Sequence, residues 1–280
     1  MAGATCALAT DFHPTLRSRL KRFFAVDPRQ DPKVWPNPSA TLKAPDVAVP
    51  DGFGTFRVFV DPGHGAKGNT GNLSCRCEDE QDFTLALGEE LGDFLRETGH
   101  FEVMLSRRGT TLVPYPQRVD RANAWGAHVF ISLHSDVRGH SEEWSPESGQ
   151  KCPSSEDAPG FSVLWSDEGS LAEGRRGLAR AAATAMLGAG FLAYDGAEYR
   201  DMYDGDATSP GVFVDRHATG KRIFVLRKPK MPSIIVETHN AWDPREAQRW
   251  AGRETRQVFH ATVYAALVAF LENSRDGSTR

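Results

Sequence analysis

The chain has 280 residues, of which 40% are hydrophobic and 25% are charged, and its formal net charge is −4. This composition is typical of a globular protein, and the slightly acidic balance excludes a broad basic surface for nucleic acid. No apolar run is long enough to span a bilayer. The first 24 residues lack a basic stretch followed by an apolar core, so we expect no clear signal peptide.

Composition divides the chain into three regions. Residues 1–55 include a stretch that is rich in proline and poor in periodicity, which predicts an N-terminal extension or linker. In residues 56–272, apolar β-branched runs alternate with helical patterns, which predicts one folded domain. Residues 273–280 are expected to form a C-terminal tail.

Apolar periodicity predicts the elements of this domain. The first strand, FRVFV, runs into the turn DPGHG, and the last helix is expected to begin at Asp243 with Pro244 in its first turn. An earlier helix is expected to open with a capping box of Ser170 and Glu173. In chain order we expect strands at 56–60, 101–106, 128–135, 161–165, 223–227 and 233–237, and helices at 82–97, 116–125, 170–187 and 243–271.

The alternation of these elements predicts an α/β fold: a mainly parallel, twisted sheet of about six strands with helices on both faces. Two long segments interrupt the alternation. Residues 137–159 form a polar insertion, and residues 193–221 form a long loop rich in Asp and Tyr. Because loops of this length are often functional, we expect both to wall the substrate groove or to occlude it.

The chain has four cysteines, and none of them belongs to a CxxC pair. The spacing of Cys75 and Cys77 is not that of a zinc ribbon. One interpretation is a disulfide from Cys75 or Cys77 to Cys152, which would fit an oxidising compartment. The other is that the cysteines, including Cys6, are unpaired thiols.

Three predicted strands end in a polar residue that can take part in chemistry: His64, His134 and Glu237. Because parallel strands bring their carboxyl ends to one edge of a sheet, these side chains are expected to lie together. Two histidines and a carboxylate are a common catalytic zinc set. Glu237 is either the third ligand or a general base, and the acidic cluster 78–80, at the start of the next helix, offers another carboxylate.

At this point the motifs indicate a family. The run VFVDPGHGAKGNTGN resembles the opening motif of the zinc-dependent N-acetylmuramoyl-L-alanine amidases of the type 3 catalytic class. The resemblance covers about residues 57–269, and each motif is weak alone but the ordered set is specific. It continues through EQDFTLALGEEL, LSRRGTTLVPYPQRVDRANAWGAHVFISLHSD, GFSVLW and VLRKPKMPSIIVETHNAWDPREA.

The resemblance implies a single zinc-hydrolase domain, with residues 56–272 as the amidase catalytic domain. It implies one Zn²⁺ per chain, held by His64, Glu80 and His134, with Glu237 as the catalytic glutamate. The implied reaction cuts the amide between N-acetylmuramic acid and the L-alanine of the peptidoglycan stem. The sequence departs from the family where a glycine-phenylalanine pair usually follows the glutamate, because residues 238–241 read THNA here.

Other functions remain open at this stage. A zinc carboxypeptidase or endopeptidase acting on cell-wall peptides is one alternative, and a metal-free wall-binding module is another. The expected substrate is peptidoglycan or a muropeptide, and the expected place of action is the bacterial cell wall or periplasm. Three alternative routes lead to this place. They are release by lysis, as for an endolysin, injection as an antibacterial effector, and export with a signal that has been trimmed. The sequence identifies no inhibitor, immunity or secretion partner.

Overall fold

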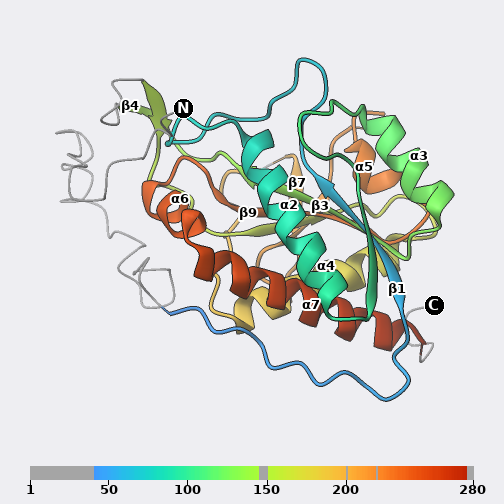
Figure 1. The fold of residues 1–280 in the computed structure, drawn as a ribbon. Coiled ribbons are helices and arrows are strands. Elements are labelled where there is room, and N and C mark those ends of the chain that lie inside the picture. Colours follow the sequence, from blue (N-terminus) through green and yellow to red (C-terminus); the bar gives the residue numbers. More distant parts are fainter. Residues whose placement is uncertain (1–40, 145–150, 200, 219, 276–280) are drawn as a thin grey trace.

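Figure 1 shows the computed structural model, which describes residues 41–144, 151–199, 201–218 and 220–275. Most of the predicted N-terminal extension and the end of the predicted C-terminal tail lie outside these residues. The described part of the extension, 41–55, lies against the folded domain. There Leu42, Val47 and Val49 contact the core, and the backbone N–H of Lys43 donates to the carbonyl of Ala189 at 3.0 Å.

The fold is organised around a seven-stranded sheet in the order β2-β1-β3-β9-β6-β8-β7. The four strands from β2 to β9 run parallel to their neighbours, whereas β6 is antiparallel to β9 and β7 is antiparallel to β8. The predicted, mainly parallel α/β sheet is confirmed. Its strands are β1 (Phe56–Pro62), β2 (Phe101–Leu105), β3 (Val129–Asp136), β6 (Ser162–Trp165), β7 (Tyr203–Gly205), β8 (Val212–Asp215) and β9 (Ser233–Asn240).

Helices cover both faces of the sheet, as predicted (Figure 1). Side chains that alternate along a strand enter two separate cores: Val58 and Val60 of β1 lie in one, and Phe59 lies in the other. The helices on the first face are α2 (Glu80–Glu97), α4 (Ala172–Gly188), α6 (Pro244–Ala251) and α7 (Arg253–Arg275), and those on the second are α3 (Tyr115–Trp125) and α5 (Phe224–Arg227). None of the described helices combines the length and the apolar character that crossing a membrane requires.

Two predictions about the type of element in the second half of the chain are wrong. The run 223–227, predicted as a strand, is the short helix α5, whose Val225 and Leu226 are buried. A short apolar run fits a buried helical turn as well as a strand, so periodicity could not distinguish them. The segment 193–221 is not one long loop, because it contains the strands β7 and β8, of which β7 lies at the edge of the sheet.

The helix starts were predicted with mixed success. The carboxylate of Asp243 accepts the backbone N–H groups of Arg245 and Glu246, which confirms the cap of α6. The predicted single last helix is divided at Gly252 into α6 and α7. The expected capping box at Ser170 is wrong, because α4 begins at Ala172 without a side-chain cap.

The insertion at 137–159 has structure of its own. It contains a two-stranded antiparallel sheet of β4 (Glu142–Trp144) and β5 (Cys152–Ser154). A disulfide joins Cys152 in β5 to Cys77 in the loop after β1, with the two Cα atoms 5.5 Å apart. Of the pairings that the sequence left open, the structure therefore has the one between Cys77 and Cys152, and it attaches the insertion to the loop that leads into α2.

Candidate metal centre and its surroundings

The turn after β1 presents His64 at the end of the sheet where the parallel strands finish. His64 has a φ of 58°, and Gly65 follows with a φ of 66°. A non-glycine residue in this left-handed region is strained and needs support from its surroundings. Arg118 of α3, which is fully buried, supplies part of that support by donating hydrogen bonds to the carbonyls of Pro62 and His64.

Three further contacts hold the same turn. Arg118 also pairs with the Asp61 carboxylate, Nη1 to Oδ1 at 2.9 Å, and both side chains are fully buried. Arg107, which follows β2, donates from Nε to the carbonyl of Pro62 at 3.0 Å and from Nη2 to that of Gly63 at 2.9 Å. The backbone around His64 is therefore held by charge-assisted hydrogen bonds from two directions.

The structure brings His64, Glu80 and His134 together. Nε2 of His64 lies 2.9 Å from Oε2 of Glu80, and Nδ1 of His134 lies 3.0 Å from Oε1 of the same carboxylate. The potential ligand atoms all lie within 4.8 Å of one another. Glu80 stands in the first turn of α2 and is 4% exposed, whereas both histidines are half-buried.

Charge and burial act against each other in this cluster. Burial raises the pKa of Glu80, but hydrogen bonds from His134 and His64 outweigh it and hold the pKa well below its usual value. Burial lowers the pKa of His64, but the hydrogen bond and negative charge of Glu80 raise it above its usual value. The carboxylate thus stays ionised, and each imidazole has an anionic neighbour.

Two asparagines orient these groups, and the sequence analysis missed both. Oδ1 of Asn69 lies 2.7 Å from Nδ1 of His64, and the Asn69 amide donates to the Tyr115 hydroxyl at 3.0 Å. If Nδ1 of His64 donates to that oxygen, Nε2 keeps its lone pair toward the cluster. The Asn72 amide donates to Oε2 of Glu80 at 2.7 Å. The only signal for these roles was their place in the run GNTGN.

Two glycines make room for the cluster. A Cβ built on Gly63 would lie 2.4 Å from Cε1 of His134, and one on Gly71 would lie 2.6 Å from Oε2 of Glu80. Real Cβ atoms do not approach other atoms this closely, so the ligand side chains lie directly against bare backbone.

Glu237 lies beside this cluster on the neighbouring strand. It pairs in register with His134 across β3 and β9. Its Oε2 is buried and has no hydrogen-bond partner among the described residues. Burial, followed by the charges of Asp136 and Glu80, raises its pKa well above the usual value, and Arg138 opposes that rise only in part. A raised pKa brings a carboxyl group toward the range in which it can both accept and release a proton near neutral pH.

Further polar residues surround Glu237, and they too were missed from the sequence. The Tyr199 hydroxyl donates to the Asp136 carboxylate and lies 2.8 Å from Oγ of Ser162, the residue that pairs with Glu237 across β6 and β9. The Arg138 guanidinium lies over the Tyr194 ring, 4.1 Å from its centre. Tyr194 and Tyr199 belong to the segment 193–221, so part of that segment borders the candidate site.

The other candidate residues lie elsewhere. Of the cluster 78–80, only Glu80 reaches the histidines, because Glu78 pairs with Arg76, with Oε2 and Nε 3.3 Å apart. His239 stacks on Trp250 with ring centres 5.4 Å apart, and burial lowers its pKa to about 3. Neither Glu78 nor His239 takes part in the cluster of His64, Glu80 and His134.

Comparisons with known proteins point to one family. A family model described as N-acetylmuramoyl-L-alanine amidase matches residues 58–269. The chain is 24% identical over 233 residues to the N-acetylmuramoyl-L-alanine amidase AmiA of Escherichia coli, covering 76% of this chain and 75% of AmiA. It is 36% identical over 84 residues to the amidase CwlM of Bacillus licheniformis, covering 30% of this chain but only 32% of CwlM.

Solved structures share the fold. The amidase Ami1 of Mycobacterium smegmatis superposes with a TM-score of 0.60 at 21% identity, covering 79% of this chain and 99% of Ami1. The amidase AmiC2 of Nostoc punctiforme gives 0.56 at 24% identity, covering 78% of this chain and 98% of AmiC2. The described sheet and its helices therefore have the architecture of these catalytic domains.

Proposed function

This chain belongs to the N-acetylmuramoyl-L-alanine amidase family, and we propose that it hydrolyses the amide between N-acetylmuramic acid and the L-alanine of the peptidoglycan stem peptide. The observation that carries the proposal is the convergence of His64, Glu80 and His134, with Glu237 on the adjoining strand. These four residues are those to which the family resemblance assigns the chemistry.

The residues of the cluster suit a zinc ion. Two imidazoles and one carboxylate form a common catalytic zinc set with room for a further ligand, and Asn69 and Asn72 already orient the donors. We therefore assign one Zn²⁺ per chain to His64, Glu80 and His134. Such an ion, when bound, acts as a Lewis acid on the scissile carbonyl and lowers the pKa of water.

Glu237 supplies the proton transfers in this proposal. An amide is a poor electrophile and its amine is a poor leaving group, so hydrolysis needs a base for water and an acid for the amine. Glu237 accepts the water proton and then delivers it to the nitrogen of L-alanine. Its buried Oε2, which has no hydrogen-bond partner among the described residues, is available for that proton.

The disulfide supports a place of action outside the cytoplasm. Disulfides such as that between Cys77 and Cys152 persist in oxidising compartments and are rare in reducing ones. Peptidoglycan lies in such a compartment, so the proposed substrate and the redox state agree.

The test is product analysis on muropeptides with the full chain. A glycan that ends in a free lactyl carboxylate, together with a peptide that has a free N-terminal L-alanine, is expected. Cleavage inside the peptide would instead identify a carboxypeptidase or endopeptidase, and binding without cleavage would identify a wall-binding module.

Metal content gives a second prediction. We expect His64→Ala and His134→Ala each to lose most bound zinc, as measured by elemental mass spectrometry, because each removes one of three ligands. His140→Ala, which removes an exposed histidine, is the matched control. A full equivalent of zinc in both ligand variants would show that the assignment is wrong.

A further inference from the structure

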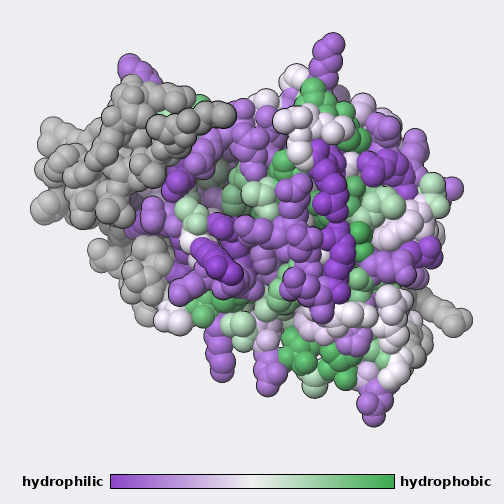
Figure 2. All heavy atoms as spheres, in the orientation of Figure 1, coloured by the Kyte–Doolittle hydropathy of each residue, from purple (hydrophilic) through white to green (hydrophobic). Residues whose placement is uncertain are grey.

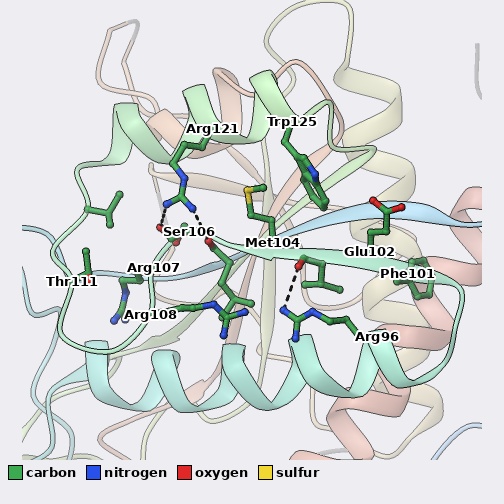
Figure 3. A pocket seen from close by; sticks show the side chains of 13 residues that line it. Arg96, Phe101, Glu102, Met104, Ser106, Arg107, Arg108, Thr111, Arg121 and Trp125 are labelled. Carbon is green, nitrogen blue, oxygen red and sulfur yellow. Dashed lines mark hydrogen bonds between the residues drawn. The ribbon is translucent and has the colours of Figure 1, made fainter.

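A groove follows the outer edge of β2, the first strand of the sheet (Figure 3). It encloses about 670 Å³ between α2 and α3, which is within the range of ligand-binding clefts. Met104 of β2 lies on its floor, and Trp125 stands on one wall (Figure 3). Val103 and Leu105 of the same strand also line it. Its floor is five residues of β2 long, so it extends over roughly 13 Å of strand.

The arginines of the two helices close this edge to strand pairing. Arg96 of α2 donates from Nη2 to the carbonyl of Val103 at 3.3 Å. Arg121 of α3 donates to the carbonyls of Ser106 at 2.7 Å and Leu105 at 3.4 Å. An added strand would need such carbonyls, so the groove offers guanidinium groups in place of a free backbone edge. The buried Ser106 hydroxyl also lines the groove and has no hydrogen-bond partner among the described residues.

Charge at the groove contrasts with that of the whole chain, which is −4. Arg96 already pairs with Asp93 of its own helix. Within the part of the chain that the structure describes, however, neither Arg108 nor Arg121 pairs with a carboxylate, and Glu102 is the one acidic lining residue. Guanidinium groups bind carboxylates with two parallel hydrogen bonds. In Figure 2 the strip between α2 and α3 shows hydrophilic side chains next to apolar ones.

The groove ends beside the loop that carries His64. Because β2 is parallel to β1, both strands finish at the same edge of the sheet. Arg107, which lines the groove, donates to the carbonyl of Gly63, and the backbone N–H of Val113 donates to the carbonyl of Gly65 at 3.0 Å. A polymer whose bond is cut at the cluster of His64, Glu80 and His134 can therefore continue into the groove.

We propose that the β2 groove binds a second peptidoglycan stem peptide, neighbouring the one that is cleaved, through the stem's carboxylates. Stem peptides are extended and carry free carboxylates together with apolar side chains, which matches guanidinium groups over an apolar floor. This proposal rests on the proposed function, because it takes its ligand from the same polymer.

The experiment measures binding apart from turnover. Co-sedimentation with purified sacculi is carried out in a Glu237→Gln background, with Arg108→Gln plus Arg121→Gln as the groove variant. Lys43→Gln plus Arg253→Gln, which removes two exposed positive charges outside the groove, is the matched control. Arg108→Gln alone serves as a second variant, because the Arg108 side chain makes no hydrogen bond with a described residue.

We expect the groove variant to bind sacculi about threefold to tenfold more weakly, the scale of two partly exposed ion pairs, and the control to bind normally. Sacculi whose carboxylates have been converted to neutral amides should bind the unaltered groove about as weakly, with no further loss in the groove variant. The proposal would be overturned if the groove variant and the control variant bound untreated sacculi with equal affinity. It would also be overturned if amidation of the sacculi weakened binding by the groove variant as much as binding by the control variant. Product analysis with the wild type tests the proposed function separately, so the two failures are distinguishable.

Discussion

Glu237 differs from its neighbours in the site because one oxygen of its carboxylate has no hydrogen-bond partner within the described residues. By contrast, both oxygens of Glu80 accept hydrogen bonds, from Asn72 and from the backbone of Ser135. A ligand needs fixed orientation, and a base needs a free lone pair. The two glutamates are therefore suited to different roles.

Replacing Glu237 by Gln tests this division of roles. Gln keeps the shape and removes the charge that accepts the proton, so we expect normal zinc content and amidase activity reduced by at least about a hundredfold. Elemental analysis and turnover of a muropeptide check the two results. Loss of zinc would make Glu237 a ligand, and retention of full activity would leave the mechanism without support.

The sequence could locate the candidate residues only in part. The sequence shows His64, His134 and Glu237 at the ends of predicted strands. Because parallel strands place these ends together, the three residues could be predicted to be neighbours. The choice of Glu80 from the cluster 78–80 needed the family resemblance. The roles of Asn69 and Asn72 depend on loop contacts that no periodicity describes. The same holds for the buried arginines at the turn, which reach it from distant positions in the chain.

At the scale of elements, the long regular helices and central strands could be predicted because each has a repeated apolar pattern. The strands β7 and β8 could not, because they are short and lie within a segment rich in Asp and Gly. The helix α5 was predicted as a strand because its four residues are too few to show helical periodicity.

The disulfide allows a prediction about the insertion. Cys77 and Cys152 are 75 residues apart, so removing their bond restores much chain entropy to the unfolded state. We expect the double variant Cys77→Ser, Cys152→Ser to lose about 2–4 kcal/mol of unfolding free energy in urea titrations. Wild type with reductant should match the variant, and reductant should leave the variant unchanged. A wild type that is insensitive to reductant would contradict the prediction.

The first turn of α6 gives a prediction about pH. Glu246 is buried and accepts backbone N–H groups of Asn240 and Gly160, and burial, with the charge of Asp243, raises its pKa to about 7. In the unfolded chain Glu246 loses its proton near its ordinary pKa of 4.5, whereas in the folded chain it keeps the proton to about 7. Between these values the unfolded state binds fewer protons, so stability falls as pH rises.

Glu246→Gln should remove this part of the pH dependence, because Gln retains an acceptor oxygen without a titrating proton. We expect wild type to lose up to about 3 kcal/mol relative to the variant between pH 4.5 and pH 7. Urea unfolding of both proteins across that range measures the difference. Parallel stability curves for the two proteins would show that Glu246 does not titrate in the folded state as stated.

At the scale of the whole molecule, alternation of strands and helices was enough to predict an α/β sheet covered on both faces. It was not enough to predict that the sheet changes direction between β9 and β6. A strand's own side chains carry no mark of which way its neighbour runs. Parallel strands are usually connected by a helix that returns along the sheet, and the described residues between β3 and β6 contain no long helix. The absence of a helical pattern in this segment was therefore the one indication in the sequence that β6 runs in the opposite direction to β3.

That reversal decides where the chain is free to vary. β3 ends at Asp136 and β6 begins at Ser162. Because β6 runs opposite to β9, both points lie on the edge that holds the cluster of His64, Glu80 and His134. In the parallel half, the connections from β1 to β2 and from β2 to β3 return along the sheet through the helices α2 and α3. The connection from 137 to 161 starts and finishes on one edge, so its length is independent of the sheet, and doubling it would cost only about 0.6 kcal/mol of closure entropy. Evolution and protein engineers can thus reshape the surroundings of the candidate site here without moving a strand of the seven-stranded sheet.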